Sequence, residues 1–253
     1  MKKFLLCLTA YYLFQISPTF SSTFSLNNDI VFKGSVVNSR AQWDWNVNSE
    51  LRSVFSNLTA DHLSEVKNGS NKVFSYNNSR VNNIEFINGV TPFPITFGSS
   101  GLLPVLSIVD MYGKSIVLNN DLESEKIKVP VLGFSRSGYE INGILSFSIL
   151  SGKAIAYQRY KSDDWYFEYN NNFLGSTALS MILNQLSSDN NSTPSNAFIH
   201  EAGYNVFNFA QSNKKDIKSF MGAYSSSIVN VNTIWGTTPH TWSSSVTIQV
   251  NYK

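Results

Sequence analysis

The 253-residue chain predicts an all-β fold: one sandwich domain that carries a helix-containing insertion. Strand-like alternation of apolar and polar residues dominates both ends of the chain. Between them, at about residues 160–222, the pattern changes and includes one segment of helical periodicity. An ordinary immunoglobulin-like sandwich needs about 100 residues, and this chain is about twice that length without a dividing linker. We therefore expect a single domain enlarged by an insertion.

Residues 1–21 are expected to be a secretory signal peptide. Two lysines open the segment, an apolar run too short for a comfortable membrane span follows, and small residues close it. Cleavage after Ser21 fits this pattern, with Ser22 and Ser25 as alternatives. An uncleaved anchor is the other interpretation. The sequence therefore predicts export from the cell.

The composition excludes several classes of site. The only cysteine, Cys7, lies in the signal segment, so the mature chain has no disulfide, cysteine nucleophile or cysteine-ligated zinc. Removal of Lys2 and Lys3 lowers the Lys+Arg count from 19 to 17, which equals the Asp+Glu count of 17. No basic run remains, and nucleic-acid binding would leave one. A surface with so little net charge repels its own copies weakly, which favours assembly.

The mature chain opens with a long alternating stretch. Four residues of one parity within residues 22–33 carry it: Leu26, Asn28, Ile30 and Phe32. The stretch "QWDWNV" repeats the alternation with Trp43, Trp45 and Val47. The apolar spacing over residues 51–66 allows a helix or a helical loop.

Further strands are expected through the middle of the chain. Asp110–Lys114 is expected to form a hairpin turn in which Gly113 supplies the permissive backbone. "SRSGY" is expected to be a second turn. The expected strands lie in "NKVFSYNNSRVNNIEFING", "LPVLSIVDMYGKSIVLNND", "KIKVPVLGF" and "EINGILSFSIL".

The insertion contains the expected helix, over residues 173–189. Its apolar positions share one helical face: Ala178, Leu179, Ile182, Leu183 and Leu186. A second short helix is expected over residues 212–226. The chain then returns to strand with "SIVNVNTIW" and with a closing strand whose alternation begins at Val246.

No residue pattern indicates an enzyme or a cofactor. The histidines His62, His200 and His240 are far apart, and Tyr204 stands where "HEAGY" would need a second zinc-binding histidine. Asp163 and Asp164 are adjacent, and neighbours on a strand point apart, so they do not form a carboxylate pair for glycoside hydrolysis. Absent motifs do not exclude an enzyme, but no catalytic, metal-ligating or cofactor-binding residue stands out, and we expect no enzyme, no metal and no cofactor.

The most aromatic stretch, "YQRYKSDDWYFEYNNNF", lies at the start of the insertion. Aromatic rings beside Asn, Asp and Arg suit sugars, because a pyranose face stacks on a ring while its hydroxyls bond polar neighbours. Tyr160, Trp165 and Tyr166 are therefore candidate glycan contacts. The alternative is that Tyr160, Trp165 and Phe167 pack the insertion onto the sandwich.

Four stretches together resemble chaperone–usher fimbrial subunits, and more closely the FaeG type of the kappa-class thin, flexible adhesive fimbriae. "VFKGSVV" is similar to the strand that begins the pilin domain, and "QWDWNV" to a stretch shortly after it. "LPVLSIVDMYGKSIVLNND" resembles the family's strand pair with its turn. "WSSSVTIQVNY" resembles the closing strand, with an aromatic residue in the penultimate position.

The resemblance implies an incomplete immunoglobulin-like sandwich, over residues 34–253, that lacks its last strand. A periplasmic chaperone fills the resulting groove, and the N-terminal extension of another fimbrial subunit replaces it at an outer-membrane usher. Residues 22–33 would be that donor strand. Beside the groove, residues of the closing strand would contact the chaperone and then the donor: Val246, Ile248, Val250 and Tyr252.

The fibre would place the subunit on the cell surface, as a major or a minor component that contributes to attachment to host cells. We expect either an unfilled groove between residues 34–47 and 244–252 or a groove filled by the chain's own N-terminus. A seventh strand made from internal sequence would argue against this interpretation. The alternatives are an adhesin subunit that binds host glycans through the insertion, and a secreted β-sandwich hydrolase.

Overall fold

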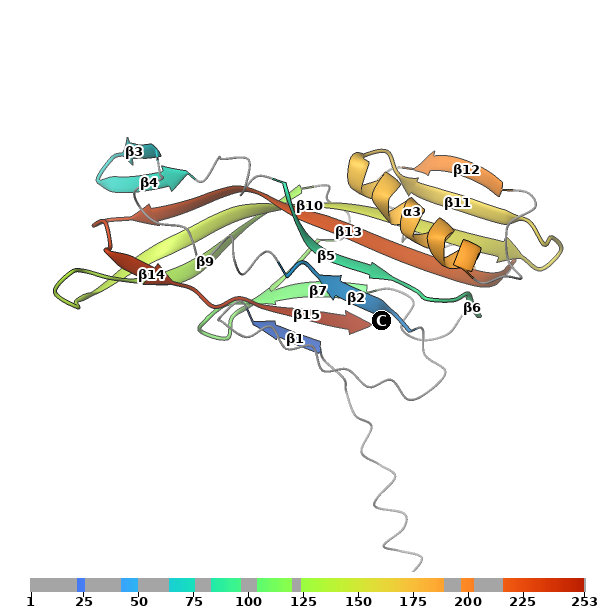
Figure 1. Ribbon diagram of the computed structural model, residues 1–253, viewed down its shortest axis with the longest axis horizontal. Coiled ribbons are helices and arrows are strands. Elements are labelled where there is room, and N and C mark those ends of the chain that lie inside the picture. The colour runs from blue at the N-terminus through green and yellow to red at the C-terminus, as the bar shows by residue number, and fades with distance from the viewer. Residues whose placement is uncertain are drawn as a thin grey trace, which may run out of the picture.

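The computed structural model describes residues 22–25, 42–49, 64–75, 83–96, 104–119, 124–188, 197–202 and 216–252. These ranges are mostly strand with one helix, and they form a sheet of four strands and a sheet of eleven (Figure 1). The expected all-β fold with a helix-containing insertion is confirmed.

The four-stranded sheet has the order β1-β15-β7-β8, and every pair in it is antiparallel. The hairpin between its last two strands has the expected turn: Gly113 has a φ of 83°, and Lys114 N donates to an Asp110 carboxylate oxygen over 2.9 Å. The four strands are β1 (Ser22–Ser25), β15 (Thr247–Tyr252), β7 (Pro104–Val109) and β8 (Ser115–Val117).

The larger sheet is built on two long, paired strands, β10 (Glu140–Arg159) and β13 (Ile217–Trp235). In the part that belongs to the sandwich, β10 also pairs with β9 and β13 also pairs with β5. Besides β10 and β13, the strands of this part are β2 (Asp44–Val47), β3 (Ser64–Asn68), β4 (Asn71–Ser75), β5 (Ile84–Val90), β6 (Ile95–Thr96), β9 (Ser124–Phe134) and β14 (Thr241–Ser243).

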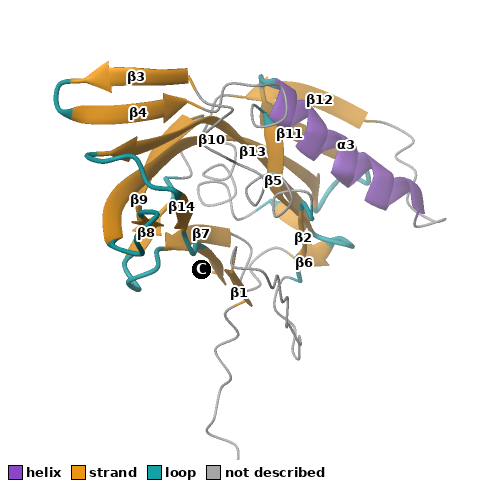
Figure 2. Ribbon diagram, turned by 60° about the vertical axis from the view of Figure 1, so that its left-hand side comes forward, coloured by secondary structure: helices purple, strands orange, loops and turns teal. Residues whose placement is uncertain are grey.

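The insertion extends this same sheet instead of forming a separate unit. The strands β10 and β13 continue past the sandwich, where β11 (Trp165–Asn170) pairs with the far end of β10 and β12 (Ala197–Ala202) pairs with β11. Helix α3 (Phe173–Ser188) covers one face of this end (Figure 2). The expected insertion boundaries therefore fall inside or at the ends of strands that also serve the sandwich.

The second helix expected in the insertion is wrong, and the helix or helical loop that the spacing over residues 51–66 allows is absent from the three of those residues that the structure describes. Residues 217–226 belong to β13, because this run is apolar on both faces and is covered by α3 on one side and by the sandwich core on the other. Residues 64–66 belong to β3, while residues 51–63 lie outside the described residues.

Helix α3 has the expected position and buried face. Asn172 caps its start, because the Asn172 side-chain oxygen accepts a 2.6 Å hydrogen bond from Gly175 N. The helix lies close against β10: a Cβ on Gly152 would be 2.0 Å from Gly175 N, so only glycine fits at 152. The predicted apolar face is buried at Ala178, Leu179, Ile182 and Leu186, and Leu183 packs partly buried beside it.

The buried residues form two cores. The sandwich core lies between the two sheets and includes Phe86, Leu106, Ile108 and Trp235. The helix-covered core lies between α3 and the far half of the β10–β13 pair, and includes Ala156, Phe167, Ile182 and Met221.

Candidate functional site

The terminal strand β15 has a neighbour on each side. On one side β7 pairs with it from Thr247 to Tyr252. On the other side β1 pairs with it antiparallel in four positions, from Ser22 opposite Val250 to Ser25 opposite Thr247 (Figure 1). The first described segment of the chain therefore lies along the last strand.

The strand order explains why this edge matters. An immunoglobulin sandwich has the spatial orders A-B-E-D and G-F-C, in which G follows F along the chain. Here β2-β5-β13-β10 and β1-β15-β7 give the same two orders. In this match β15 holds the position of strand F, and the position of strand G beside it is held by β1, which precedes all other described strands in sequence.

The predicted acceptor residues occupy the buried face of β15 and the position before it. Val246, Ile248 and Val250 are each 1% exposed and belong to the sandwich core. Tyr252, two residues further, is 38% exposed. The alternation seen in the sequence therefore has one buried face, and its last member reaches the surface at the end of the strand.

Tyr252 also ties the end of β15 to the other sheet. Trp45 Nε1, from β2, donates a 2.7 Å hydrogen bond to the Tyr252 hydroxyl. Burial raises the pKa of that hydroxyl, although the hydrogen bond from Trp45 acts in the opposite direction. The Trp45 ring lies over Gly89, where a Cβ would be 2.4 Å from the ring, so the glycine is required for this position.

The predicted donor residues Leu26, Asn28, Ile30 and Phe32 lie outside the described residues, as do residues 1–21. The four residues directly before Leu26 are those that form β1. Pairing with β15 therefore begins at the residue that follows the predicted cleavage site, Ser21.

A second candidate site is a row of three stacked aromatic rings across the insertion. Tyr157, Tyr166 and Phe198 come from β10, β11 and β12, and neighbouring ring centroids are 5.4 and 5.3 Å apart. The Arg159 guanidinium lies 4.9 Å from the Tyr166 ring centroid, and the Tyr157 hydroxyl donates to a Glu168 carboxylate oxygen over 3.3 Å. We call these three rings the aromatic row.

The aromatic row is graded from buried to exposed. Tyr157 is buried, and burial raises the pKa of its hydroxyl. Tyr166 is half-buried, and Phe198 is 54% exposed. The open ring at the surface therefore belongs to Phe198, while Arg159 lies over the Tyr166 ring and Glu168 accepts from the Tyr157 hydroxyl.

The structure separates the three candidate glycan contacts. Tyr166 lies in the aromatic row, and Tyr160 is 65% exposed in the turn after β10. Trp165 is 4% exposed inside the helix-covered core, which corrects the expectation that its ring meets a ligand. Because Trp165 and Tyr166 are adjacent on a strand, their side chains point to opposite faces of the sheet. Trp165 faces α3, and Tyr166 faces away from it.

Sequence reasoning missed Tyr157, Arg159 and Phe198 as members of this site. Tyr157 and Arg159 lie two residues apart inside the aromatic stretch. The period-two alternation of a strand would have placed both on the same face of the sheet. Phe198 lies beyond α3 in sequence, and only the parallel pairing of β12 with β11 brings it to Tyr166. No local sequence signal specifies that pairing.

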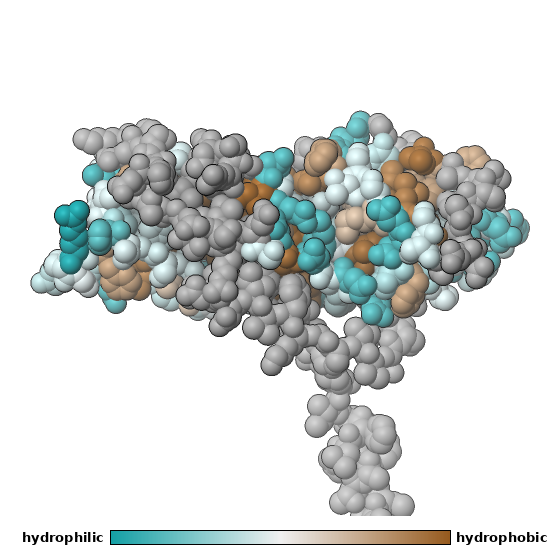
Figure 3. Space-filling model, viewed as in Figure 1, coloured by the Kyte–Doolittle hydropathy of each residue, from teal (hydrophilic) through white to brown (hydrophobic). Residues whose placement is uncertain are grey.

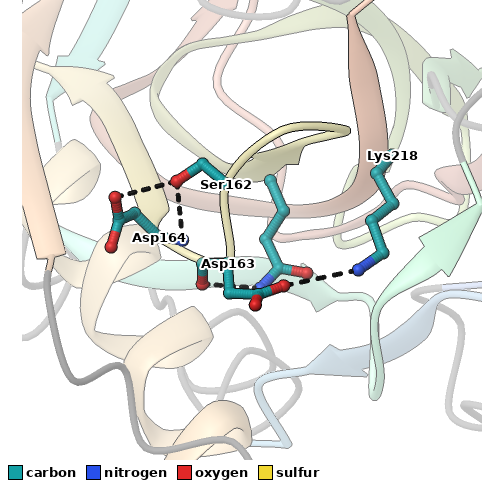
Figure 4. A network of polar contacts seen from close by, with 5 residues as sticks. Ser162, Asp163, Asp164 and Lys218 are labelled. Atoms are coloured by element: carbon teal, nitrogen blue, oxygen red, sulfur yellow. Dashed lines mark hydrogen bonds and ion pairs between the residues drawn. The ribbon is translucent and has the colours of Figure 1, made fainter.

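The acidic pair of the β10–β11 turn does not form a catalytic dyad. The Asp164 carboxylate accepts a 2.8 Å hydrogen bond from the Ser162 hydroxyl, while Asp163 pairs with Lys218 over 3.6 Å (Figure 4). The two carboxylates point apart, as expected. Within the described ranges, no group of three or more His, Cys, Asp or Glu side chains could hold a metal ion.

No family model and no curated protein matches the chain. Among the residues that the structure describes, no helix is long and apolar enough to cross a membrane. Among the coloured residues in Figure 3, hydrophilic, intermediate and hydrophobic residues are interspersed. This matches a composition in which charged residues make up only 14% of the chain.

Proposed function

We propose that this chain is an exported structural subunit of an adhesive surface fimbria, assembled by strand addition. The N-terminal segment of one copy, or of a related subunit, would complete the sheet of the next copy along β15. A periplasmic chaperone would cover that edge first, and an outer-membrane usher would be the place of exchange. The proposal rests on the resemblance of four sequence stretches and on one structural observation.

That observation is the position of β1. The sheet edge beside β15 is completed by β1, Ser22–Ser25, from the N-terminal part of the chain. A strand at a chain end is the kind of element that copies can exchange without breaking the rest of the fold. Main-chain hydrogen bonds would supply affinity, and the buried row Val246, Ile248 and Val250 would supply specificity.

The chemistry of the donor segment supports the same proposal. Leu26, Ile30 and Phe32 share one parity, and burial of three such side chains contributes roughly 5–9 kcal/mol before ordering costs. A chain whose only cysteine is Cys7 needs such a contact if its polymer is to persist outside the cell.

Deletion of residues 22–32 tests the proposal. The truncated subunit should still fold with its chaperone, and it should not be donated to a neighbour. The measurement is the heat-labile, SDS-resistant ladder formed when it is co-expressed with wild-type subunits. Ladders that still incorporate the truncated subunit as a donor would refute the donor assignment.

Two point variants give a matched control. Ile30→Asp places a charge on the apolar parity and should abolish the ladder, while Asn27→Asp places the same charge on the polar parity and should keep it. Equal ladders from both variants would contradict the proposed pattern. Co-purification of a stoichiometric chaperone from the periplasm would support the class independently.

A second function is favoured by the aromatic row, namely glycan binding by the same subunit. Phe198 presents an open ring that stacks on Tyr166, and Arg159 lies over the Tyr166 ring, so an aromatic face and a charged donor occur in one row, as suits a sugar. Phe198→Ala and Tyr166→Ala, with assembly intact, should abolish binding on a glycan array. Tyr139→Ala, at an exposed tyrosine in the β9–β10 turn, is the control, and unchanged binding by the first two variants would remove this function.

A further inference from the structure

We propose that β12 is an interaction edge, along which two copies of the chain pair side by side in an antiparallel arrangement. The partner is a second copy, and the contact would join the large sheets of the two copies into one. This inference goes beyond the proposed function and does not depend on it, because β12 pairs with β11 in the large sheet, whereas β1 and β15 belong to the other sheet.

The exposed side chains of β12 indicate that the partner is a strand. Among the strands that the structure describes, β12 ends the order of the large sheet and pairs only with β11. Phe198 and Ile199 are 54% and 56% exposed. Because they are adjacent on a strand, they lie on opposite faces of the sheet. A partner packed on one face would bury only one of them, whereas a strand added at the edge would contact both.

The edge of β12 lacks the features by which proteins commonly prevent edge pairing, namely short strands, lysines, prolines and bulges. β12 has six residues, none of which is Lys, Arg or Pro, and it pairs with β11 regularly over its whole length. By contrast, β3 at the other end of the same strand order contains Glu65 and Lys67, and β8 at the end of the smaller sheet has three residues. Of these three end strands, β12 is the one best suited to pairing.

A second copy fits this edge because the edge is compatible with itself. A two-fold axis perpendicular to the sheet makes the two β12 strands antiparallel and gives both copies the same contacts. The chain from Ser22 onward has 17 Lys+Arg (19 minus Lys2 and Lys3) and 17 Asp+Glu. Repulsion between two copies is therefore weak.

The aromatic row sets the register that we expect. Its ring centroids are 5.4 and 5.3 Å apart from β10 to β11 to β12, and it ends at Phe198. With Phe198 opposite Phe198 of the second copy, both rings lie on one face, and the row continues across the axis as a cross-strand aromatic pair. This pairing would cover the open side of Phe198, so a subunit would use the ring either for pairing or for a sugar.

Self-association of the chain from Ser22 to Lys253 tests the inference, since this chain retains every residue that the structure describes. We expect a reversible dimer in sedimentation equilibrium. Phe198→Lys should weaken the dimer at least about ten-fold, because the axis places two lysines opposite each other. The control is Val117→Lys, at a residue that is 61% exposed on the end strand β8, and it should leave the dimer unchanged.

Complementary charges test the register. Phe198→Glu should be monomeric by itself for the same reason as Phe198→Lys. An equimolar mixture of the two variants should recover a dimer, because opposite charges then face each other across the axis. Phe198→Lys mixed with Ile199→Glu is the matched control and should stay monomeric, because the two positions lie on opposite faces of the sheet. Recovery in the first mixture also shows that both of its variants are folded.

Four results would overturn the inference: a monomeric wild type, a dimer weakened as much by Val117→Lys as by Phe198→Lys, a Lys–Glu mixture at residue 198 that stays monomeric, and equal recovery with Ile199→Glu. Strand donation is measured separately, because its ladders resist SDS and the edge dimer should not. A monomeric wild type that still forms ladders would remove this inference alone. An intact edge dimer without ladders would remove the proposed function alone.

Discussion

The two halves of the β10–β13 pair are covered in different ways. In the sandwich half, the covering layer is the sheet of β15, β7 and β8, and its edge strand β1 comes from the other end of the chain. In the helix half, the covering layer is α3, which begins at Phe173, directly after β11 ends at Asn170. The helix half is covered by a segment that directly follows β11 in sequence. The sheet that covers the sandwich half is completed by β1, which is distant in sequence from β15.

Under the proposed function, α3 is a fixed cover and β1 is an exchangeable one. Helix α3 is tied to the chain at both of its ends and fits against Gly152 with no room for a side chain, so it cannot be exchanged without breaking the half that it covers. Strand β1 is tied at one end only in a chain that starts at Ser22. Its closure over the sandwich spans almost the whole chain, and such long closures are entropically costly and easily reopened.

The test with the largest expected loss of stability compares two buried phenylalanines, one from each core. Phe86 in the sandwich core and Phe167 in the helix-covered core are each 1% exposed. Replacement of either by alanine should lower the free energy of unfolding by about 3–5 kcal/mol, through lost burial and a residual cavity. Urea denaturation gives the size of each loss.

Hydrogen exchange then distinguishes the two halves. Phe167→Ala should lower amide protection in α3 and β11 while β7 and β15 keep theirs, because the helix half is built locally. Phe86→Ala should lower protection in both sheets of the sandwich. A uniform loss of protection in both variants would show that the two halves unfold as one unit. The sandwich half and the helix half would then differ in architecture but not in stability.

The next test uses the pH dependence of the sandwich half. Burial raises the pKa of the Tyr224 hydroxyl from 10.0 to about 12 in the folded protein. Because the folded pKa lies above the unfolded one, the stabilisation is fully present below pH 10 and is lost as the pH rises toward 12. At a pH above both pKa values, a shift of this size lowers the free energy of unfolding by about 3 kcal/mol.

Tyr224→Phe should therefore unfold with a shallower dependence on pH between 10 and 12 than the wild type. The tyrosinate absorbance and the urea midpoint at each pH measure the two sides of this linkage. Tyr139→Phe, in the exposed β9–β10 turn, should leave the slope unchanged. Burial also raises the pKa of Tyr252, so some alkaline loss of stability should remain in Tyr224→Phe.

Sequence patterns predicted the fold well wherever one element controls its own burial. Val246, Ile248 and Val250 alternate because one face of β15 is buried, and Ala178 and Ile182 recur at helical spacing because one face of α3 is buried. The strand over 217–226 was missed for the opposite reason. Both of its faces are covered, so no periodicity distinguishes it from a buried helix.

The sites were less predictable, because they depend on pairings between distant segments. Tyr166 was identified from its aromatic neighbours, but Phe198 reaches it only through the parallel addition of β12. For Trp165 the sequence left ligand contact and packing both open, since a short aromatic run does not reveal which parity meets the helix, and the structure buries it. The position of β1 beside β15 needed the strand order of the whole sheet.

The smallest expected effect is at the end of β15, where Tyr252 contacts Trp45 of the other sheet. Tyr252→Phe removes only the hydroxyl that accepts the 2.7 Å hydrogen bond from Trp45 Nε1, so it should lower stability by about 1 kcal/mol. Trp45→Phe with Tyr252→Phe completes a double-mutant cycle, whose coupling energy isolates this bond from the packing of Trp45 over Gly89. If the coupling is zero, the end of β15 is held by its pairing with β7 alone. If it is close to the full loss, the bond ties the two sheets together at the edge where β1 ends, and hydrogen exchange at Val250 should rise in Tyr252→Phe before it rises anywhere in α3.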